Sequence, residues 1–418
     1  MDGHGTEPTA RPESVGLSAE RLARLDAHLR RRYVEPGKIA GALALVFRRG
    51  EIAWRSVLGS MDLERGKPMR DDAIFRIYSM TKPIVSVALM TLYEEGHFRL
   101  ADPVHRFLPA FRDLRVFAGG NHPRFLTRPA ERPMTVGDLL THTSGLTYGF
   151  LERTNVDAAY RKLGVGDRKP GATLAEMVEV LATLPLEFSP GRAWNYSVAT
   201  DVVGHLVECI SGRPLDRFLA ERIFEPLGMV DTGFAVPAAL LPRFAACYAR
   251  TASRRLVLED DPERSLWARE VTFFSGGGGL VSTAADYLRF ARMLLGGGAL
   301  DGARILSRKT LELMTRNHLP GGADLATLAR GGFAETPYEG VGFGLGFSVL
   351  LDPVLQGAGS PGEFAWGGAA STVFFVDPRE ELIVIFLTQL LPSTTYDFRG
   401  QLKALVYGAL DDAAPARA

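Results

Sequence analysis

The chain reads Phe75-Arg76-Ile77-Tyr78-Ser79-Met80-Thr81-Lys82-Pro83 and then stays mainly apolar to Gly96. Because the residues that follow are apolar on nearly every side, we expect a helix buried at the centre of the fold. Ser79 opens this helix, and Lys82 lies three residues later on the same face, where its amine can reach the hydroxyl. Serine is a weak nucleophile until a base removes its proton. The stretch therefore predicts a reactive serine with a lysine base.

Strand patterns lie outward from this helix, toward both chain ends. Short apolar or alternating runs predict strands at 40–47, 51–57, 344–350, 371–376 and 382–388, and after Gly276 we expect strands to resume. Helical periodicity predicts helices in the middle of the chain at 135–140, 174–184, 199–210 and 215–224. Further helices are expected after Ser18 and over 399–410.

This distribution favours an α/β fold of the layered α+β type, with an antiparallel sheet flanked by helices. We expect residues 1–101 and 268–418 to build the α/β domain, and residues 102–267 to form an inserted, mainly helical domain. The chain has 418 residues, which is long enough for two such units. A cleft between them is the natural place for an active site.

A tyrosine stands in a second stretch that points to chemistry, Trp194-Asn195-Tyr196-Ser197-Val198. The stretch follows the turn Ser189-Pro190-Gly191 and precedes the helix expected from Ala199, so Tyr196 is expected to project from a loop into the cleft. Beside a lysine ammonium, a phenol can relay a proton from the nucleophile to a leaving group. Taken alone, a tyrosine is more often a packed side chain with a hydrogen-bonded hydroxyl.

A glycine pair marks the third stretch, Trp366-Gly367-Gly368-Ala369, which we expect just before the strand at 371–376. Two glycines at the start of a strand would let a substrate approach the backbone closely. The N–H of Ala369 could then join that of Ser79 as an oxyanion hole. The alternative is a plain turn with a packed tryptophan.

Together the three stretches resemble the serine β-lactamase and penicillin-binding-protein superfamily, in particular its class C-like branch and the family VIII carboxylesterases. The resemblance runs from about residue 16 to about residue 408 and includes Leu139–Leu146, Ile223–Met229 and Gly278–Asp286. It implies a β-lactamase/transpeptidase-like fold. It also implies site roles, with Ser79 as nucleophile, Lys82 as its base, Tyr196 as the catalytic tyrosine, Trp366-Gly367-Gly368 at the K-T-G position and Ala369 as the second oxyanion donor.

Two residues depart from the β-lactamase pattern. Val198 stands where β-lactamases carry an asparagine that bonds a substrate amide, and Trp366 stands where they carry a lysine that pairs with a substrate carboxylate. The esterase branch is similar to this chain at both positions, so the resemblance implies an apolar wall suited to small neutral esters of short acyl chains. We expect the substrate-binding residues to be Trp366, Gly367, Gly368, Val198, Tyr148, Phe150 and Phe343.

We predict a serine carboxylesterase that forms an acyl-enzyme on Ser79, with weak β-lactam hydrolysis or transesterification as variants. The open alternatives are a true class C-like β-lactamase, a D-amino-acid peptidase, and a β-lactam- or peptidoglycan-binding protein that is acylated without turnover. An α/β-hydrolase is disfavoured because the sequence has no G-x-S-x-G stretch and its last histidine is His318. We expect His142 to be a packed structural residue. No metal or cofactor is implied.

The charge balance sets the expected partners. Forty-eight basic and 48 acidic residues cancel, so we expect neither nucleic acid nor an anionic membrane as a partner, only a small-molecule ester. The apolar run 382–387 is far shorter than the roughly 20 residues of a membrane span. Because the polar start has no signal-peptide pattern, we expect a cytoplasmic protein, although a chain with its leader removed would look the same. The oligomeric state is left open.

Overall fold

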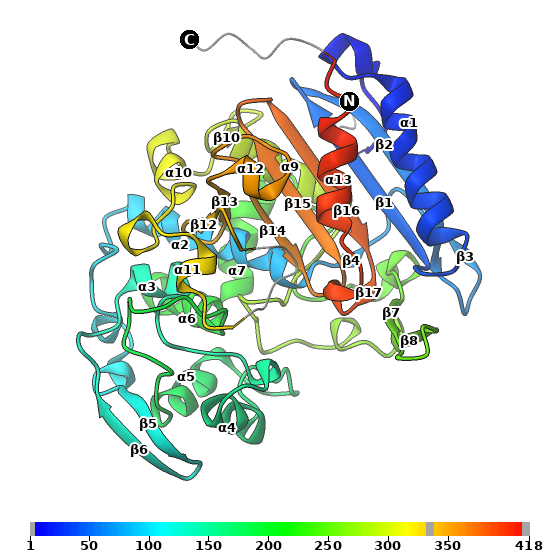
Figure 1. Ribbon diagram of the computed structural model, residues 1–418. Coiled ribbons are helices and arrows are strands. Elements are labelled where there is room, and N and C mark those ends of the chain that lie inside the picture. The colour runs from blue at the N-terminus through cyan, green and yellow to red at the C-terminus, as the bar shows by residue number, and fades with distance from the viewer. Residues whose placement is uncertain (1–4, 332–337, 412–418) are drawn as a thin grey trace.

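An eight-stranded antiparallel sheet forms the middle of the structure, a computed structural model that describes residues 5–331 and 338–411 (Figure 1). Strand β1 pairs with β2 on one side and with β16 on the other, where Leu45 lies opposite Ile385. Both chain ends therefore build one sheet, and the predicted antiparallel sheet flanked by helices is confirmed. In spatial order its strands are β12 (Val341–Phe343), β13 (Ser348–Leu350), β14 (Phe364–Gly368), β15 (Thr372–Asp377), β16 (Leu382–Thr388), β1 (Gly41–Arg48), β2 (Glu51–Asp62) and β3 (Lys67–Pro68).

Alternate residues of β1 face two separate cores, as the two-residue period of a strand requires. Leu43 and Leu45 belong to the larger core, which contains the buried faces of α2 and α9. Ala42 and Ala44 belong to the second core, where α1 and α13 cover the front of the sheet in Figure 1. These four helices are α1 (Ala19–Leu29), α2 (Thr81–Glu94), α9 (Ala284–Leu295) and α13 (Phe398–Tyr407).

Helix α2 is the buried helix that the sequence predicts. A short 3-10 turn, Tyr78–Met80, leads directly into it, and every residue from Thr81 to Leu92 is buried. The helix ends before Gly96, which has a positive φ of 80° that glycine adopts without strain. Ser79 therefore stands, partly buried, at the start of a helix whose body is buried on all sides.

The middle of the chain contains the predicted helices and also strands that the sequence analysis missed. Its helices are α3 (Val136–Leu140), α4 (Asn155–Leu163), α5 (Leu174–Ala182), α6 (Ala199–Ser211), α7 (Leu215–Leu219) and α8 (Glu225–Leu227). Strands β5 (Arg115–Asn121) and β6 (Arg124–Pro129) form a hairpin that extends away from the main sheet in Figure 1. Most of the hairpin is not buried, so its sequence lacks the apolar alternation by which strands are recognised.

The middle segment is also joined to the C-terminal part of the chain. Strand β7 (Cys247–Arg250) pairs with β8 (Leu256–Asp260) and, in parallel, with β17 (Leu390–Leu391). The domain boundaries at residues 101/102 and 267/268 stay a prediction, and the ranges 1–4, 332–337 and 412–418 of the proposed α/β domain lie outside the described residues. The remaining short elements are β4 (Phe75–Arg76), β9 (Val281–Ser282), β10 (Ala299–Leu300), β11 (Ala303–Arg304), α10 (Arg308–Met314), α11 (Leu325–Leu328) and α12 (Pro353–Gln356).

Helix α9 lies between the short strand β9, which follows Gly276, and the later strands. Thr283 caps this helix by accepting the backbone N–H of Asp286 at 3.2 Å. The ring of Tyr287 packs edge-on against Phe374 of the sheet at a centroid distance of 5.0 Å. Apolar residues recur with helical spacing here, and the cap decides where the helix begins.

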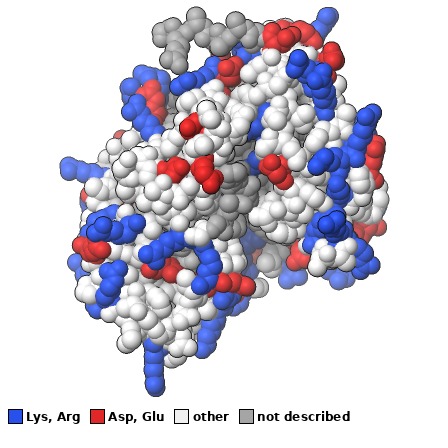
Figure 2. All heavy atoms as spheres, in the orientation of Figure 1, with Lys and Arg blue, Asp and Glu red and all other residues white. Residues whose placement is uncertain are grey.

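Charged side chains are mixed over the surface rather than sorted by sign. Figure 2 shows basic and acidic residues interspersed over the face that carries α13, in keeping with the zero net charge. Within residues 5–331 and 338–411, none of the helices combines the length and the apolar character that a bilayer crossing requires.

Candidate active site

Three side chains that the sequence marks as reactive converge at the start of α2. Lys82 Nζ donates a hydrogen bond to Ser79 Oγ at 3.2 Å, and the hydroxyl of Tyr196 donates to the same oxygen at 2.6 Å. Lys82 and Tyr196 are 1% and 2% exposed, whereas Ser79 is only partly buried. An amine and a phenol on one hydroxyl oxygen can together move its proton.

A buried carboxylate organises the backbone that holds Lys82. Lys82 Nζ donates to the carbonyl oxygen of Gly277 at 2.6 Å. Asp201 accepts the N–H of Gly277 at 2.9 Å and the hydroxyl of Ser275 at 2.6 Å. A Cβ at position 277 would lie 2.5 Å from Asp201 Oδ2, so the close approach requires glycine. Asp201 thus positions the Gly277 peptide, whose carbonyl oxygen accepts the hydrogen bond from Lys82.

Asp201 is a residue that the sequence analysis missed. It stands in the first turn of α6, five residues after Tyr196, and is 3% exposed. Burial raises the pKa of this carboxyl, and the charge of Lys82 opposes that rise. The only signal in the sequence is an acidic residue near a helix start, which is common on helices that have no catalytic role.

The turn before Ser79 has an unusual backbone conformation. Tyr78 has a φ of 43°, a left-handed conformation that costs a non-glycine residue roughly 1–2 kcal/mol. Its ring meets that of Trp267 edge-on at 5.5 Å, and Trp267 Nε1 donates to the carbonyl oxygen of Gly279 at 2.7 Å. These contacts hold the turn that presents Ser79 at the helix start.

The end of β14 approaches this turn closely. A side chain at Gly368 would collide with the carbonyl oxygen of Ile77 and with Thr372. The Trp366-Gly367-Gly368 stretch lies at the end of β14 and not at the beginning of the next strand. The missing side chain of Gly368 allows the backbone at Ile77 to approach. Ala369, the next residue, lines the same pocket as Ser79. This placement accommodates the predicted oxyanion hole of the two N–H groups, which stays a prediction.

The pocket in front of Ser79 has a volume of about 520 Å³. Tyr148 and Phe150 line it and stack on each other at a centroid distance of 4.6 Å. Burial, Asp201 and Tyr196 raise the pKa of Tyr148 well above its usual value, so its phenol stays neutral. The pocket thus combines Ser79 with an aromatic wall against which an acyl or alcohol group can pack.

The sequence match extends over almost the whole chain. The sequence model of the Beta-lactamase family matches residues 27–408. The chain belongs to the β-lactamase family.

Relatives of this β-lactamase-family protein include esterases. It is 37% identical over 399 residues to esterase EstB from Burkholderia gladioli, with 93% of this chain and 94% of EstB covered. It is 39% identical over 372 residues to an uncharacterized protein from Mycobacterium tuberculosis (strain CDC 1551 / Oshkosh), with 88% and 90% covered. Among solved structures, EstCE1, a hydrolase with promiscuous acyltransferase activity, matches with a TM-score of 0.76, 28% identity and 94% and 98% coverage. The predicted resemblance and fold are confirmed, and these relatives support a serine hydrolase.

Other predicted substrate-binding residues lie behind the pocket wall. Val198 and Phe343 are each 1% exposed, and neither is among the residues that line the pocket in the described part of the chain. Trp366 packs against Tyr196 at 5.5 Å and against Phe343 at 5.3 Å between ring centroids. A side chain at Gly367 would meet the guanidinium of Arg399 and the carbonyl oxygen of Thr372. In this β-lactamase-family site these residues support the wall, and their contact with substrate stays a prediction.

His142 packs beneath the site, as the sequence analysis expects. Its ring lies 5.0 Å from that of Tyr196, and its Nδ1 is 3.2 Å from Ser197 Oγ. Burial lowers the pKa of His142 well below its usual value, and the charge of Lys82 lowers it further. The imidazole is therefore neutral and supports the ring of Tyr196 from below.

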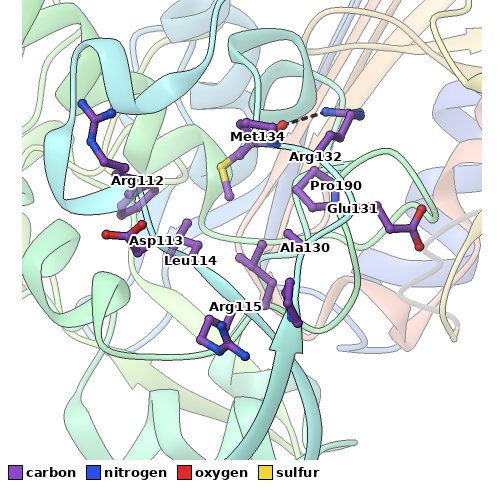
Figure 3. A pocket seen from close by; sticks show the side chains of 13 residues that line it. Arg112, Asp113, Leu114, Arg115, Ala130, Glu131, Arg132, Met134 and Pro190 are labelled. Carbon is purple, nitrogen blue, oxygen red and sulfur yellow. Dashed lines mark hydrogen bonds between the residues drawn. The ribbon is translucent and has the colours of Figure 1, made fainter.

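A second hollow of this β-lactamase-family protein lies beside the β5–β6 hairpin and has a volume of about 330 Å³. Figure 3 shows Leu114, Ala130 and Met134 in its wall, while Glu131 points away from it. None of the described lining residues carries a hydroxyl, thiol, amine or imidazole. The hollow therefore differs from the pocket at Ser79, whose lining includes serine and tyrosine hydroxyls.

Proposed function

We propose that this protein is a serine carboxylesterase that hydrolyses small esters through an acyl-enzyme on Ser79. The observation that carries the proposal is that Lys82 and Tyr196 both contact Ser79 Oγ at the wall of a pocket of about 520 Å³. Trp366, which stands where β-lactamases carry a carboxylate-binding lysine, favours esters over β-lactams. The esterase relatives EstB and EstCE1 support the same choice.

Acylation begins when the carbonyl carbon of a bound ester lies next to Ser79 Oγ. Lys82, in its neutral form, takes up the hydroxyl proton as the Oγ–carbon bond forms, while Tyr196 still carries its phenol proton. The carbonyl oxygen becomes negative and is stabilised by the N–H groups of Ser79 and Ala369, each worth about 3 kcal/mol. When the tetrahedral intermediate collapses, Tyr196 gives a proton to the departing alcohol oxygen, so that neutral alcohol leaves and Ser79 is esterified.

Deacylation uses the same groups in reverse. A water molecule occupies the place of the alcohol and passes a proton to Tyr196, which became a phenolate when it protonated the alcohol, as the water oxygen attacks the acyl carbon. The bond to Ser79 Oγ then breaks, and Lys82 returns the proton to that oxygen. The products are a carboxylic acid and the free serine. Asp201 takes no proton in this cycle; it holds the Gly277 peptide against Lys82.

The proposal is tested by hydrolysis of p-nitrophenyl butyrate by the wild type, Ser79→Ala and Ser86→Ala. Ser86 lies on the same helix and is buried, so it controls for loss of a helix hydroxyl. We expect Ser79→Ala to lose at least about 10³-fold in kcat and Ser86→Ala to stay near wild type. A phosphonate inhibitor is expected to label Ser79, as mapped by mass spectrometry. Hydrolysis that persists in Ser79→Ala would refute the assignment.

The time course separates the alternatives. Steady release of p-nitrophenol over many turnovers supports the esterase, whereas one burst equal to the enzyme concentration indicates a protein that is acylated without turnover. A cephalosporin or a D-alanyl dipeptide hydrolysed faster than every ester would instead indicate a β-lactamase or a D-amino-acid peptidase.

A further inference from the structure

One cation of the pocket wall has no carboxylate partner within residues 5–331 and 338–411. Arg168 lines the pocket of Ser79, and its guanidinium carbon lies 3.6 Å from the ring centroid of Trp267. Trp267 in turn packs edge-on against Tyr78, the residue before the nucleophile. The guanidinium therefore stands beside the turn that presents Ser79. No hydrogen bond or ion pair from Arg168 to another described residue accompanies this stacking.

The acids whose charges act on Arg168 are engaged elsewhere. Asp260 accepts from Arg76 Nε at 2.7 Å and from the hydroxyl of Ser265 at 2.9 Å. Asp201 accepts from the hydroxyl of Ser275 and the N–H of Gly277. Neither carboxylate forms an ion pair with Arg168 in the described part of the chain.

The other charged residues of the wall are paired or lie at its rim. Arg161 forms an ion pair with Asp157 at 3.0 Å, and Asp167 pairs with Lys169 at 3.2 Å. Glu152 is exposed at the rim. Among the described residues, Arg168 thus differs from Arg161, another arginine of the wall, in forming no ion pair with a carboxylate.

The stacked guanidinium of Arg168, which has no carboxylate partner among the described residues, is available to bind an anion. Burial lowers the pKa of Arg168 to about 10, although the charges of Tyr78, Asp260 and Asp201 oppose the shift. Its flat face rests on an indole ring, which leaves the N–H groups at its edge for a ligand. Guanidinium edges bind carboxylates through two parallel hydrogen bonds, and a bound carboxylate would restore the charge balance that burial disturbs.

We propose that Arg168 binds a carboxylate of the substrate, so that the preferred ester carries a carboxylate on its acyl or its alcohol half, away from the scissile bond. This inference rests on the proposed esterase function and names its substrate class. It revises the expectation of neutral esters. The K-T-G position carries Trp366 and so has no cation. Arg168, from another segment of the chain, places a cation in the pocket wall.

The test uses two pairs of esters in which a carboxylate away from the scissile bond is either free or capped as its methyl ester. In the acyl pair, the p-nitrophenyl monoester of adipic acid is compared with its methyl-capped analogue. In the alcohol pair, 4-carboxyphenyl acetate is compared with its methyl ester. We expect the wild type to prefer the anionic member of one pair, and Arg168→Gln to lower that charged-to-neutral ratio of kcat/KM about 10- to 100-fold, mainly through KM. The kcat/KM for the neutral esters is expected to change less than the kcat/KM for the anionic esters.

Two variants make the result specific to the guanidinium. Arg168→Lys keeps the charge but loses the paired hydrogen bonds, so it is expected to retain an intermediate preference. Arg112→Gln removes an arginine from the separate hollow of Figure 3 and is expected to leave the ratio unchanged. The wild-type preference is also expected to weaken as the salt concentration rises.

The outcomes separate this inference from the proposed function. If Arg168→Gln hydrolyses the neutral esters normally and keeps the same charged-to-neutral ratio for both pairs, Arg168 does not bind a carboxylate, while the esterase proposal stands. A wild type with no preference in either pair overturns the inference in the same way. If the wild type hydrolyses none of the four esters, the esterase proposal fails, and the inference falls with it.

Discussion

The phenol oxygen of Tyr196 lies 2.6 Å from Ser79 Oγ, although 117 residues separate the two along the chain. Helices α2 and α6 pack against each other, so the loop that ends at α6 passes over the start of α2. Trp194 stacks beside the Tyr196 ring at 6.2 Å, and His142 lies beneath it. A phenol held this firmly can give its proton in one step and take a proton back in the next.

Replacement of Tyr196 by phenylalanine removes this hydroxyl and keeps the ring. We expect kcat for p-nitrophenyl butyrate to fall roughly 10²–10⁴-fold, because proton transfer to and from the leaving group is lost. KM is expected to change little, since the aromatic contacts remain. Tyr93→Phe, a partly buried tyrosine of α2, is the matched control. An unchanged kcat in Tyr196→Phe would remove this residue from the mechanism.

The charge of Asp201 is tested by Asp201→Asn, which keeps the shape and the acceptor oxygen but removes the negative charge near Lys82. A negative charge favours the ammonium form, so its removal makes the neutral amine available at lower pH. We expect the acidic limb of the kcat/KM profile to move down by about one pH unit. Asp113→Asn, at the separate hollow, is the control. A limb that stays in place would mean that Asp201 acts through packing alone.

Gly368→Ala tests the close approach of β14 to the nucleophile turn. The added methyl group would collide with the carbonyl oxygen of Ile77, so the strand end must shift away from Ser79. Because misplacement by about 1 Å can cost 10²-fold in rate, we expect kcat/KM to fall about 10- to 100-fold. Gly233→Ala is the control, since a Cβ there has no neighbour closer than 3.8 Å. Full activity in Gly368→Ala would show that this approach is not needed.

The buried His142 is expected to make the stability of the folded protein depend on pH. Its pKa is lowered in the folded state, so the unfolded chain binds the proton more readily than the folded chain below about pH 6.5. Stability is therefore lost as the pH falls, by at most about 1.4 kcal/mol per pH unit from this residue. We choose His142→Asn because asparagine tolerates the φ of 56° at this position. Denaturant unfolding at pH 7.5 and pH 5.0 is expected to show a smaller acid-induced loss in the variant, and an equal loss would contradict the prediction.

Local patterns predicted much of the fold. The apolar run after Ser79 indicates α2, and the runs at 40–47 and 382–388 indicate β1 and β16, which are neighbours in the sheet. These elements are buried, so their residues must be apolar at positions that repeat with the period of a helix or strand. The β5–β6 hairpin was missed for the same reason, because its largely unburied residues are free of that requirement.

The sequence by itself determined the family and the nucleophile candidate, because Ser79 and Lys82 are neighbours on one helix turn and their contact follows from helix geometry. Only the tertiary structure decided how Asp201 reaches Lys82 through Gly277, and that Arg168 stands in the pocket on Trp267. These contacts join segments that are far apart in the chain. Their distances depend on how whole helices and loops pack, and no spacing along one segment encodes them.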